Sequence, residues 1–259
     1  MYFNRVRKWM TLAAALVTLA TPLASIGGQT VRTVTLVGDN APGTNGATFR
    51  RVIVTQFESI VVDARGRVSF FGQLQGEGVD GSNADGVWSE TTGSLQLVAR
   101  DGDAAPGTPA GVVFFDIVEG LHDSLSINAA GQLAFHSGLA GDGVDASNAS
   151  GYWIGDADTL RLGARAGDAA PGVAGATFGA FEFYGTPRLN SAGQVSLHRL
   201  LSGPGITAAT NDGIWTGLPD ALQLVVWERS LSPGLPPGTS LSQFGNPPAF
   251  SEDGTVAFR

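Results

Sequence analysis

The sequence contains no cysteine, and its 259 residues include only three histidines, two methionines and one lysine, Lys8. The lack of cysteine excludes a disulfide framework, so stability must come from the packing of secondary structure. Charged residues are also scarce, at 15%, whereas 37 glycines and 13 prolines are present. This composition predicts many short strands joined by tight turns rather than helices or a disordered chain.

The only long apolar run lies at the N-terminus. A basic stretch, "NRVRKWM", leads into "TLAAALVTLATPLA", a pattern typical of a secretory signal peptide. The run is shorter than the roughly 20 apolar residues that a membrane span needs, although an uncleaved anchor is the alternative. We therefore expect residues 1–28 to be a signal peptide cleaved between Ala20 and Gly28. The mature protein would be secreted or held at the cell surface, without membrane insertion.

The net charge excludes one class of partner. Once Arg5, Arg7 and Lys8 are removed with the leader, 12 of the 15 basic residues remain against 23 acidic ones, a formal charge of −11. Such a surface repels nucleic acid and anionic lipid. We expect neither as a partner, and we expect a monomer.

Three landmarks recur along the chain with one period. The first is a Pro-Gly turn, as in "RDGDAAPG" and "RAGDAAPG", at Pro42, Pro106, Pro171 and, less cleanly, Pro233. The second is an Asn-x-x-Gly pattern, which begins at Asp63, Asn128, Asn190 and Ser251. The third is a Gly-x-Trp strand, which contains Trp88, Trp153 and Trp215. A shared period of about 63 residues indicates one supersecondary unit that stacks on its neighbours.

Each unit is predicted to hold four antiparallel strands. In the second unit these are residues 124–127, 132–139, 151–154 and 160–165, and Asn128 to Gly131 is a hairpin tip with a left-handed glycine. Four such strands per repeat are typical of a β-propeller blade. The predicted fold is therefore all-β, with tandem units bounded near residues 42, 106, 171 and 233 in one domain, residues 29–259.

The two ends of the chain match parts of a unit. Residues 33–37, "TVTLV", resemble a last strand, and "TVAFR" at the C-terminus resembles a second strand. These leftover strands could pair into a composite blade that closes a four-bladed ring and removes exposed edges. The alternative is a fragment of a larger propeller.

The motifs resemble a family of exported bacterial tandem-repeat proteins named for an Asn-x-x-Gly-x-x-Ala-Phe repeat. Asn128, Gly131, Ala134 and Phe135 keep this pattern in full, and the other units are variants. The resemblance covers about residues 34–259 and implies exported repeats, often held at the cell surface, with no established reaction.

Two acidic loops are candidate metal sites. They place oxygen-bearing side chains at spacings that could surround one calcium ion: Glu77, Asp80, Asn83 and Asp85, and then Asp142, Asp145 and Asn148. The third loop has Pro204, Thr207 and Thr210 at the matching places, and the spacing is not that of an EF-hand. The competing interpretation is that these side chains cap their own turns.

Catalytic motifs are lacking. The sequence has no G-x-S-x-G elbow, H-E-x-x-H or P-loop, and the histidines have no metal-binding spacing. His136 and His198 follow the second-strand pattern, which predicts strand ends, and the repeated tryptophans are predicted to form core contacts between units.

Two functions stay open. The first is a non-enzymatic exported scaffold that binds an extracellular glycan or protein through the loops 76–85, 141–150 and 203–212. It needs no cofactor other than calcium, if the acidic loops bind it. The alternative is a carbohydrate-active propeller enzyme, a hydrolase or lyase, whose carboxylates gather in the central channel and occur in one blade only.

Overall fold

The computed structural model describes residues 23–26, 29–52, 60–117, 125–180, 187–230, 236, 238–241, 244 and 248–258. The chain divides into two compact units, Met1–Val34 and Thr35–Arg259. In the first unit, β1 (Leu23–Ile26) pairs antiparallel with β2 (Gln29–Val31). Of the predicted signal peptide the structure describes only Leu23–Ile26, so the leader stays a prediction.

The second unit, Thr35–Arg259, is built from antiparallel strands, and none of its described residues forms a helix. The first sheet contains β3 (Thr48–Val52), β4 (Ile60–Val62), β5 (Val68–Gln75), β6 (Asp85–Ser89) and β7 (Gln96–Arg100). The second contains β8 (Val113–Phe115), β9 (Ser126–Ile127), β10 (Leu133–Ala140), β11 (Ser150–Gly155) and β12 (Arg161–Arg165). The third contains β13 (Thr177–Phe178), β14 (Arg188–Leu189), β15 (Val195–Ser202), β16 (Asp212–Gly217) and β17 (Gln223–Trp227). The all-β prediction is confirmed.

Each sheet has one strand more than the sequence predicts. In the second sheet, β8 pairs with the far half of β10 and β9 with its near half, so the first strand of the unit comes in two pieces. The first and third sheets repeat this arrangement with β3 and β4, and with β13 and β14. The additional piece is only two to five residues long and directly follows the Pro-Gly turn, so it shows little alternation in the sequence.

The Asn-x-x-Gly tips are the predicted hairpin turns. Gly131 adopts a φ of 93°, and its N–H donates to Asn128 O at 3.0 Å. The side chain of Asn128 holds the turn, because its Oδ1 accepts the Gln132 N–H at 2.9 Å. Its Nδ2 donates to the carbonyl oxygen of Asn190 in the next tip at 2.8 Å. The motif therefore both closes a hairpin and joins neighbouring units.

The residue after each tip glycine packs on the next tip. A side chain added at Gly193 would lie 2.9 Å from Gln132 Oε1, and one added at Gly254 would lie 3.3 Å from Gln194 Oε1. In the first unit Arg67 takes this place, bound to Asp63 Oδ2 through Nε at 2.6 Å and through Nη2 at 2.5 Å. The tips thus form a continuous column along the stacked sheets.

The Pro-Gly turn folds onto the tryptophan of its own sheet. The indole N–H of Trp153 donates to Pro106 O at 3.0 Å, and Trp88 and Trp215 make the same bond to Pro42 and Pro171. The glycine that follows the proline rests on the last strand, since a Cβ at Gly107 would lie 2.7 Å from Leu162 Cβ. Each sheet contains one such tryptophan, and its indole N–H is bonded by the turn. The chain therefore repeats the Pro-Gly turn once per sheet.

The tryptophans lie in the core, as predicted. Trp88, Trp153 and Trp215 are fully buried. Around Trp153, Phe114 packs edge-on with ring centroids 4.8 Å apart, and Phe135 stacks at 6.5 Å. This cluster continues into Phe71 and Val87 of the first sheet, so the two sheets share one core.

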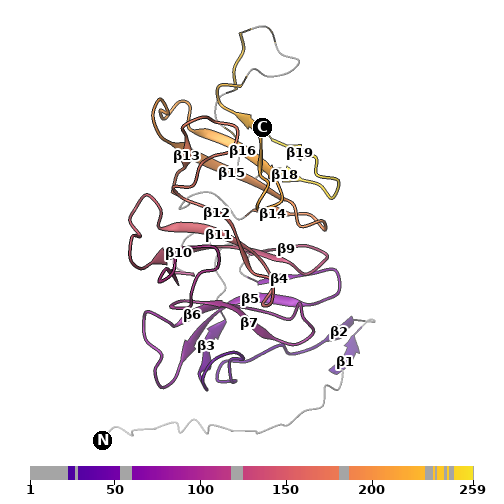
Figure 1. Ribbon diagram of the computed structural model, residues 1–259. Helices are drawn as coiled ribbons and strands as arrows, with labels where there is room; N and C mark the ends of the chain where they lie inside the picture. Colours follow the sequence, from indigo (N-terminus) through magenta and orange to yellow (C-terminus); the bar gives the residue numbers. More distant parts are fainter. Residues whose placement is uncertain are drawn as a thin grey trace, which may run out of the picture. The chain divides into compact units, whose positions relative to one another are not determined.

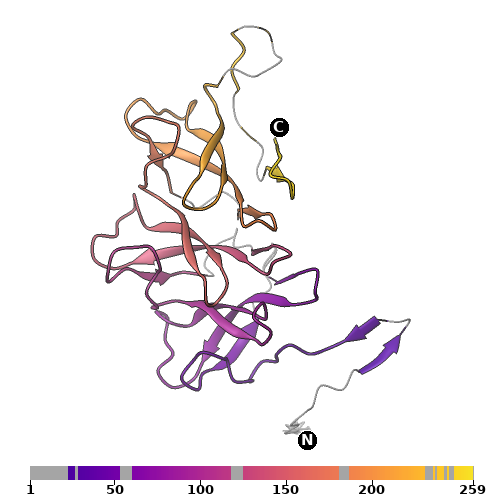
Figure 2. The ribbon, with the colours of Figure 1, turned by 45° about the vertical axis from the view of Figure 1, so that its right-hand side comes forward.

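Neighbouring sheets stack in chain order. Tyr152 and Ile154 of the second sheet pack with Trp215 and Phe178 of the third, and Ile214 of the third packs with Phe244. The strands β4, β9, β14 and β18 (Ala249–Phe250) contact one another in turn. Figure 1 and Figure 2 both show the three large sheets following one another from purple through magenta to orange.

The predicted end strands differ from the structure. Residues 33–37 form no strand, and Leu36 and Val37 are exposed. At the other end β18 (Ala249–Phe250) pairs with β19 (Val256–Ala257), and among the described residues this sheet has only these two strands. The composite blade is therefore not formed in the described chain, and ring closure stays a prediction. The fourth Pro-Gly turn, at Pro233, lies outside the described residues.

Candidate functional site

The two predicted calcium loops have the same conformation. In the first, Asp80 Oδ1 accepts the Ser82 N–H at 2.8 Å and the Ser82 hydroxyl at 2.6 Å. Asn83 Oδ1 accepts the Asp80 N–H at 3.0 Å, and its Nδ2 donates to Gly78 O at 3.0 Å. In the second loop Asp145, Ser147, Asn148 and Gly143 repeat every one of these bonds. The side chains cap their own turns, and this capping lowers the pKa of Asp80 and of Asp145.

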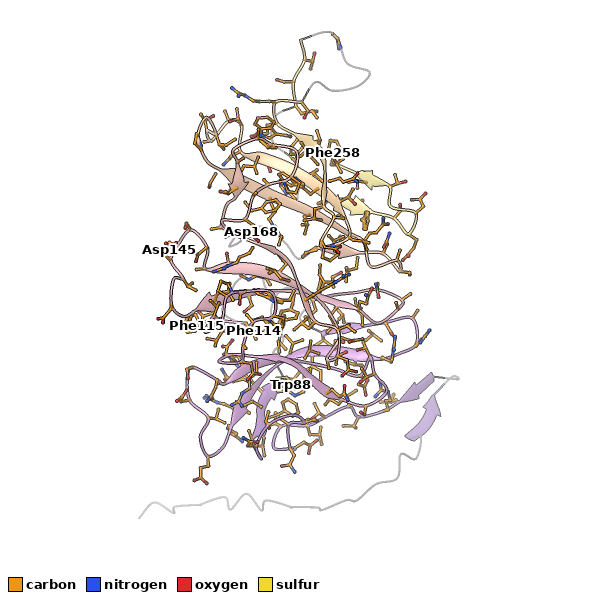
Figure 3. All side chains as sticks on the ribbon, viewed as in Figure 1. Trp88, Phe114, Phe115, Asp145, Asp168 and Phe258 are labelled. Carbon is orange, nitrogen blue, oxygen red and sulfur yellow. The ribbon has the colours of Figure 1, made fainter. Side chains whose placement is uncertain are left out.

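The remaining predicted ligands lie apart from these caps. Glu77 and Asp142 are exposed, and Asp85 starts β6, where its Oδ1 accepts from Gln73 Nε2 at 3.0 Å. In the residues that the structure describes, no three His, Asp or Glu side chains form a group that could hold a metal ion. Figure 3 shows Asp145 on a loop at the edge of the second sheet.

The third loop reaches the same turn without carboxylates. There the Thr207 N–H donates to Thr210 Oγ1 at 2.9 Å, and the Thr210 N–H donates to Thr207 O at 2.8 Å. Each loop is also bound from the last strand of its sheet: Arg100 Nε donates to Asn83 O, Arg165 Nε to Asn148 O, and Trp227 Nε1 to Thr210 O. Hydrogen bonds within the protein therefore suffice to fold all three loops.

We expect calcium to leave the stability of the protein unchanged. A ligand that binds only the folded state raises the melting temperature. In these loops one carboxylate oxygen of each aspartate and the amide oxygen of each asparagine already accept hydrogen bonds within the loop. Thermal melts of residues 29–259 in millimolar calcium and in chelator should agree within about 1 °C. A rise of several degrees with calcium that is lost in Asp80→Asn and Asp145→Asn would instead establish metal sites.

A recess of about 650 Å³ opens beside the first loop. It is lined by Arg50 of β3, Gln73 of β5, Asp80 of the loop, Asp85 of β6 and Asp116, which follows β8. Asp116 is a non-glycine residue with a left-handed φ of 54°, a conformation that aspartate tolerates better than most residues. The recess offers guanidinium and amide donors together with carboxylate acceptors.

A buried carboxyl group lies next to the recess. Asp101 is only 2% exposed, and its Oδ1 accepts the N–H of Ile117 at 3.1 Å. Burial, with a contribution from the charges of Asp85 and Asp116, raises the pKa of Asp101 to about 7. Asp101 is therefore partly protonated near neutral pH, unlike an ordinary surface aspartate.

Asp101 and Asp116 were not among the predicted site residues. One signal for Asp101 is visible in the sequence, because "RDGDAAPG" and "RAGDAAPG" differ only at Asp101 and Ala166. Asp116 has no such signal, because it comes from the unit that follows the loop and meets the recess only when the sheets stack.

The third sheet carries a different polar cluster at the matching place. Asp212 Oδ2 accepts the Phe244 N–H at 3.1 Å, its N–H donates to Glu228 Oε2 at 3.0 Å, and Asp212 Oδ1 contacts His198 Nε2. The prediction of strand-end histidines is wrong, because His136 and His198 lie within β10 and β15. His122 lies outside the described residues.

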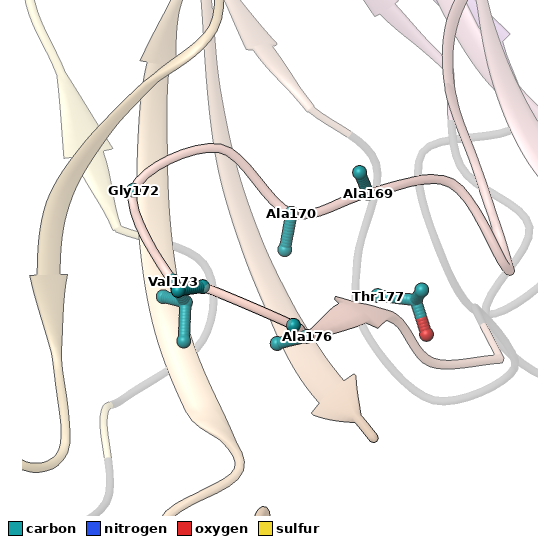
Figure 4. A pocket seen from close by; sticks show the side chains of 8 residues that line it. Ala169, Ala170, Gly172, Val173, Ala176 and Thr177 are labelled. Carbon is teal, nitrogen blue, oxygen red and sulfur yellow. The ribbon is translucent and has the colours of Figure 1, made fainter. Parts of the chain in front are cut away.

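A second hollow, of about 600 Å³, lies inside the third Pro-Gly turn. Its walls are the small side chains of Ala169, Ala170, Val173, Ala176 and Thr177, as Figure 4 shows. It contains no charged group, so it offers little to a polar ligand. The recess of the first sheet is the better candidate site.

Within the described residues no helix is long and apolar enough to cross a membrane. A comparison with curated proteins found no match. Residues 11–159 match a protein family described as a family of unknown function, DUF7453. This match covers more than half of the chain and includes the whole first sheet and its recess, and the protein is therefore a member of the DUF7453 family.

Proposed function

We propose that the protein is an exported, propeller-like repeat scaffold that binds an extracellular glycan through the recess of the first sheet. The observation that carries this proposal is the lining of the recess. Arg50 and Gln73 supply donors, and Asp85 and Asp116 supply acceptors, in one open space of about 650 Å³. Sugar hydroxyls both donate and accept hydrogen bonds, so such a mixed lining suits them better than a purely acidic one.

Two residues of the recess, Arg50 and Gln73, break the repeat, as residues that determine specificity should. Gln73 pairs with Asp85, the first residue of β6. The residue that pairs with the first residue of the equivalent strand is Gly138 in the second sheet and Leu200 in the third. Phe115 takes the place of Arg50 in the second unit, because Phe49 and Phe114 make the same backbone bonds. Shared positions serve folding, so the differences are where binding specificity can lie.

Phe115 adds an apolar surface near the recess. It is 41% exposed and precedes Asp116 in the chain. Ligand sites commonly combine aromatic surface with a few directed polar groups. A glycan that bonds to the recess could therefore rest one sugar face on this ring.

The propeller arrangement and export belong to the same proposal. Consecutive sheets stack through equivalent faces, and the Asn-x-x-Gly tips of the second, third and fourth units are linked by equivalent contacts, as expected of blades around an axis. The resemblance of the motifs to those of the exported Asn-x-x-Gly-x-x-Ala-Phe repeat proteins supports a place outside the cytoplasm. The N-terminal basic and apolar segments support cleavage of a leader.

A sedimentation assay with purified residues 29–259 tests glycan binding. Insoluble cell-wall glycan, chitin and cellulose are the probes, and we expect the protein to sediment with at least one of them. Asp85→Asn and Phe115→Ala should each weaken this binding by about tenfold, since each removes about 1.4 kcal/mol of contact.

The control variants are Glu77→Gln and Asp142→Asn. Both remove an exposed acid from the same kind of loop, and neither residue lines the recess. Equal loss of binding in the controls would mean that net charge, not the recess, holds the glycan. Absence of binding to all probes, with capture of a soluble protein partner through the same residues, would favour protein recognition.

A glycan-cleaving enzyme is the second candidate, because one observation favours it. Asp85, Asp101 and Asp116 gather at the first sheet. The second sheet has Ser150 and Ala166 in place of the first two, and the third has Asp212 and Glu228. Glycosidic cleavage needs one protonated and one ionised carboxyl group, and a pKa near 7 suits the acid. Release of reducing ends from the same glycans, lost in Asp101→Asn, would establish this activity. The bond from Ile117 gives Asp101 a structural role without catalysis, so binding is the main proposal.

A further inference from the structure

Asp101 lies at the junction between the first and second sheets. Its backbone follows β7, and its N–H donates to Asp85 O at 3.0 Å. Its carboxylate accepts from Ile117, a residue of the next unit that is fully buried in the core shared by both sheets. The Asp101 carboxyl group therefore holds the chain where the second sheet meets the first.

The surroundings of this carboxyl group are acidic. Asp85 reaches it from β6 and Asp116 from the segment after β8, and both act on it by like-charge repulsion. Arg100 is its neighbour in the chain, but Arg100 Nε is bound to Asn83 O in the loop. Arg50 and Asp80 line the recess with Asp85 and Asp116.

The residues equivalent to Asp101 at the other two junctions between sheets differ from it. At the second junction Ala166 replaces Asp101, so this position carries no titratable group. At the third, Glu228 takes the place of Asp101, is also buried and accepts the Asp212 N–H at 3.0 Å. There the bond to the following segment comes from Asp212, which accepts the Phe244 N–H and contacts His198. The first junction alone, among those that the structure describes, combines a buried carboxyl group with two further carboxylates and a backbone anchor in the next sheet.

We propose that Asp101 makes the junction of the first and second sheets a proton-sensitive joint, which holds more firmly when Asp101 is protonated. The proposal does not depend on glycan binding. Its direction follows from the electrostatics: the Ile117 N–H favours the ionised form, but burial and the charges of Asp85 and Asp116 outweigh it and raise the folded-state pKa of Asp101 above its ordinary value of 3.8 to about 7. The stabilisation is therefore complete below about pH 4 and is lost as the pH rises through about 7.

The test combines stability with one local probe. Urea unfolding and hydrogen exchange of the Ile117 amide, corrected for its intrinsic rate, are measured at pH 5 and pH 8. We expect the wild-type protein to unfold at lower urea at pH 8, and Ile117 protection to fall by about tenfold. Asp101→Asn keeps the acceptor oxygen and removes the charge, so its Ile117 protection should be the same at both pH values.

Two further variants keep the result interpretable. Asp85→Asn removes one facing charge and should reduce the pH dependence without removing the Ile117 bond. Asp103→Asn is the control: burial raises the pKa of Asp103 too, but Asp103 lies in the Pro-Gly turn and makes no side-chain bond to Ile117 in the described chain. The proposal fails if Ile117 protection in Asp101→Asn falls as much as in the wild type, or if Asp103→Asn abolishes the pH dependence.

Discussion

Replacing Trp153 by alanine should destabilise the protein by about 3–5 kcal/mol and lower its melting temperature by about 10 °C or more. Trp153 is fully buried, packs against Phe114 and Phe135, and donates its indole N–H to Pro106 O. The substitution leaves a large cavity in the core that the first and second sheets share, and it also releases the Pro-Gly turn. Urea and thermal unfolding measure the loss.

Two other variants separate the contributions. Trp153→Phe keeps most of the ring but leaves the Pro106 carbonyl without its donor, so it should cost less, about 1–3 kcal/mol. Phe115→Ala removes an aromatic ring of the same strand as Phe114 that is 41% exposed, and should cost below about 1 kcal/mol. A Trp153→Ala protein that is as stable as Phe115→Ala would contradict the shared core.

Replacing Gly203 by alanine is expected to cost about 3 kcal/mol or more, through backbone strain and a direct clash. Gly203 has a φ of 132°, a region that side chains rarely adopt. An added Cβ would lie 2.7 Å from Gly175 O and 3.3 Å from the Ala176 Cα, and neither backbone atom can move aside freely. Urea unfolding of the purified variant gives the cost.

Gly205 in the same loop is the matched control. It has a φ of 78°, but a Cβ there would meet no atom within 4 Å. Gly205→Ala should therefore cost only about 1–2 kcal/mol, from the left-handed conformation alone. Equal costs at both glycines would mean that the loop relaxes away from Gly175, and that close packing does not constrain it.

The strands and turns were predictable because their signals are local and repeated. Residues 151–154 and 160–165 were predicted as strands and correspond to β11 and β12, since alternation and turn residues mark them in each unit. The short strand β8 was missed, because three residues after a turn carry no period. Residues 33–37 were predicted as a strand because they resemble the last strand of a unit, but a strand needs a partner to satisfy its backbone.

In the acidic loops the sequence pattern did not distinguish between two roles of the same side chains. Their spacing suggested calcium ligands, and the spacing was real, but Asp80 and Asn83 serve their own turn. Short polar side chains in loops compete for local backbone groups as readily as for ions, and spacing alone does not separate the two uses. The third loop, with Thr207 and Thr210, was the sequence signal in favour of capping.

The sequence by itself determined the repeat, the antiparallel strands, the glycine turns and the burial of the tryptophans, because each depends on residues close together in one unit. Only the tertiary structure decided which residues of different units come into contact. It brought Asp116 close to Asp101, joined Asp101 to Ile117, and packed Gln132 against Gly193. Those contacts join residues of different units, and their energies depend on burial and distance, which no local pattern contains.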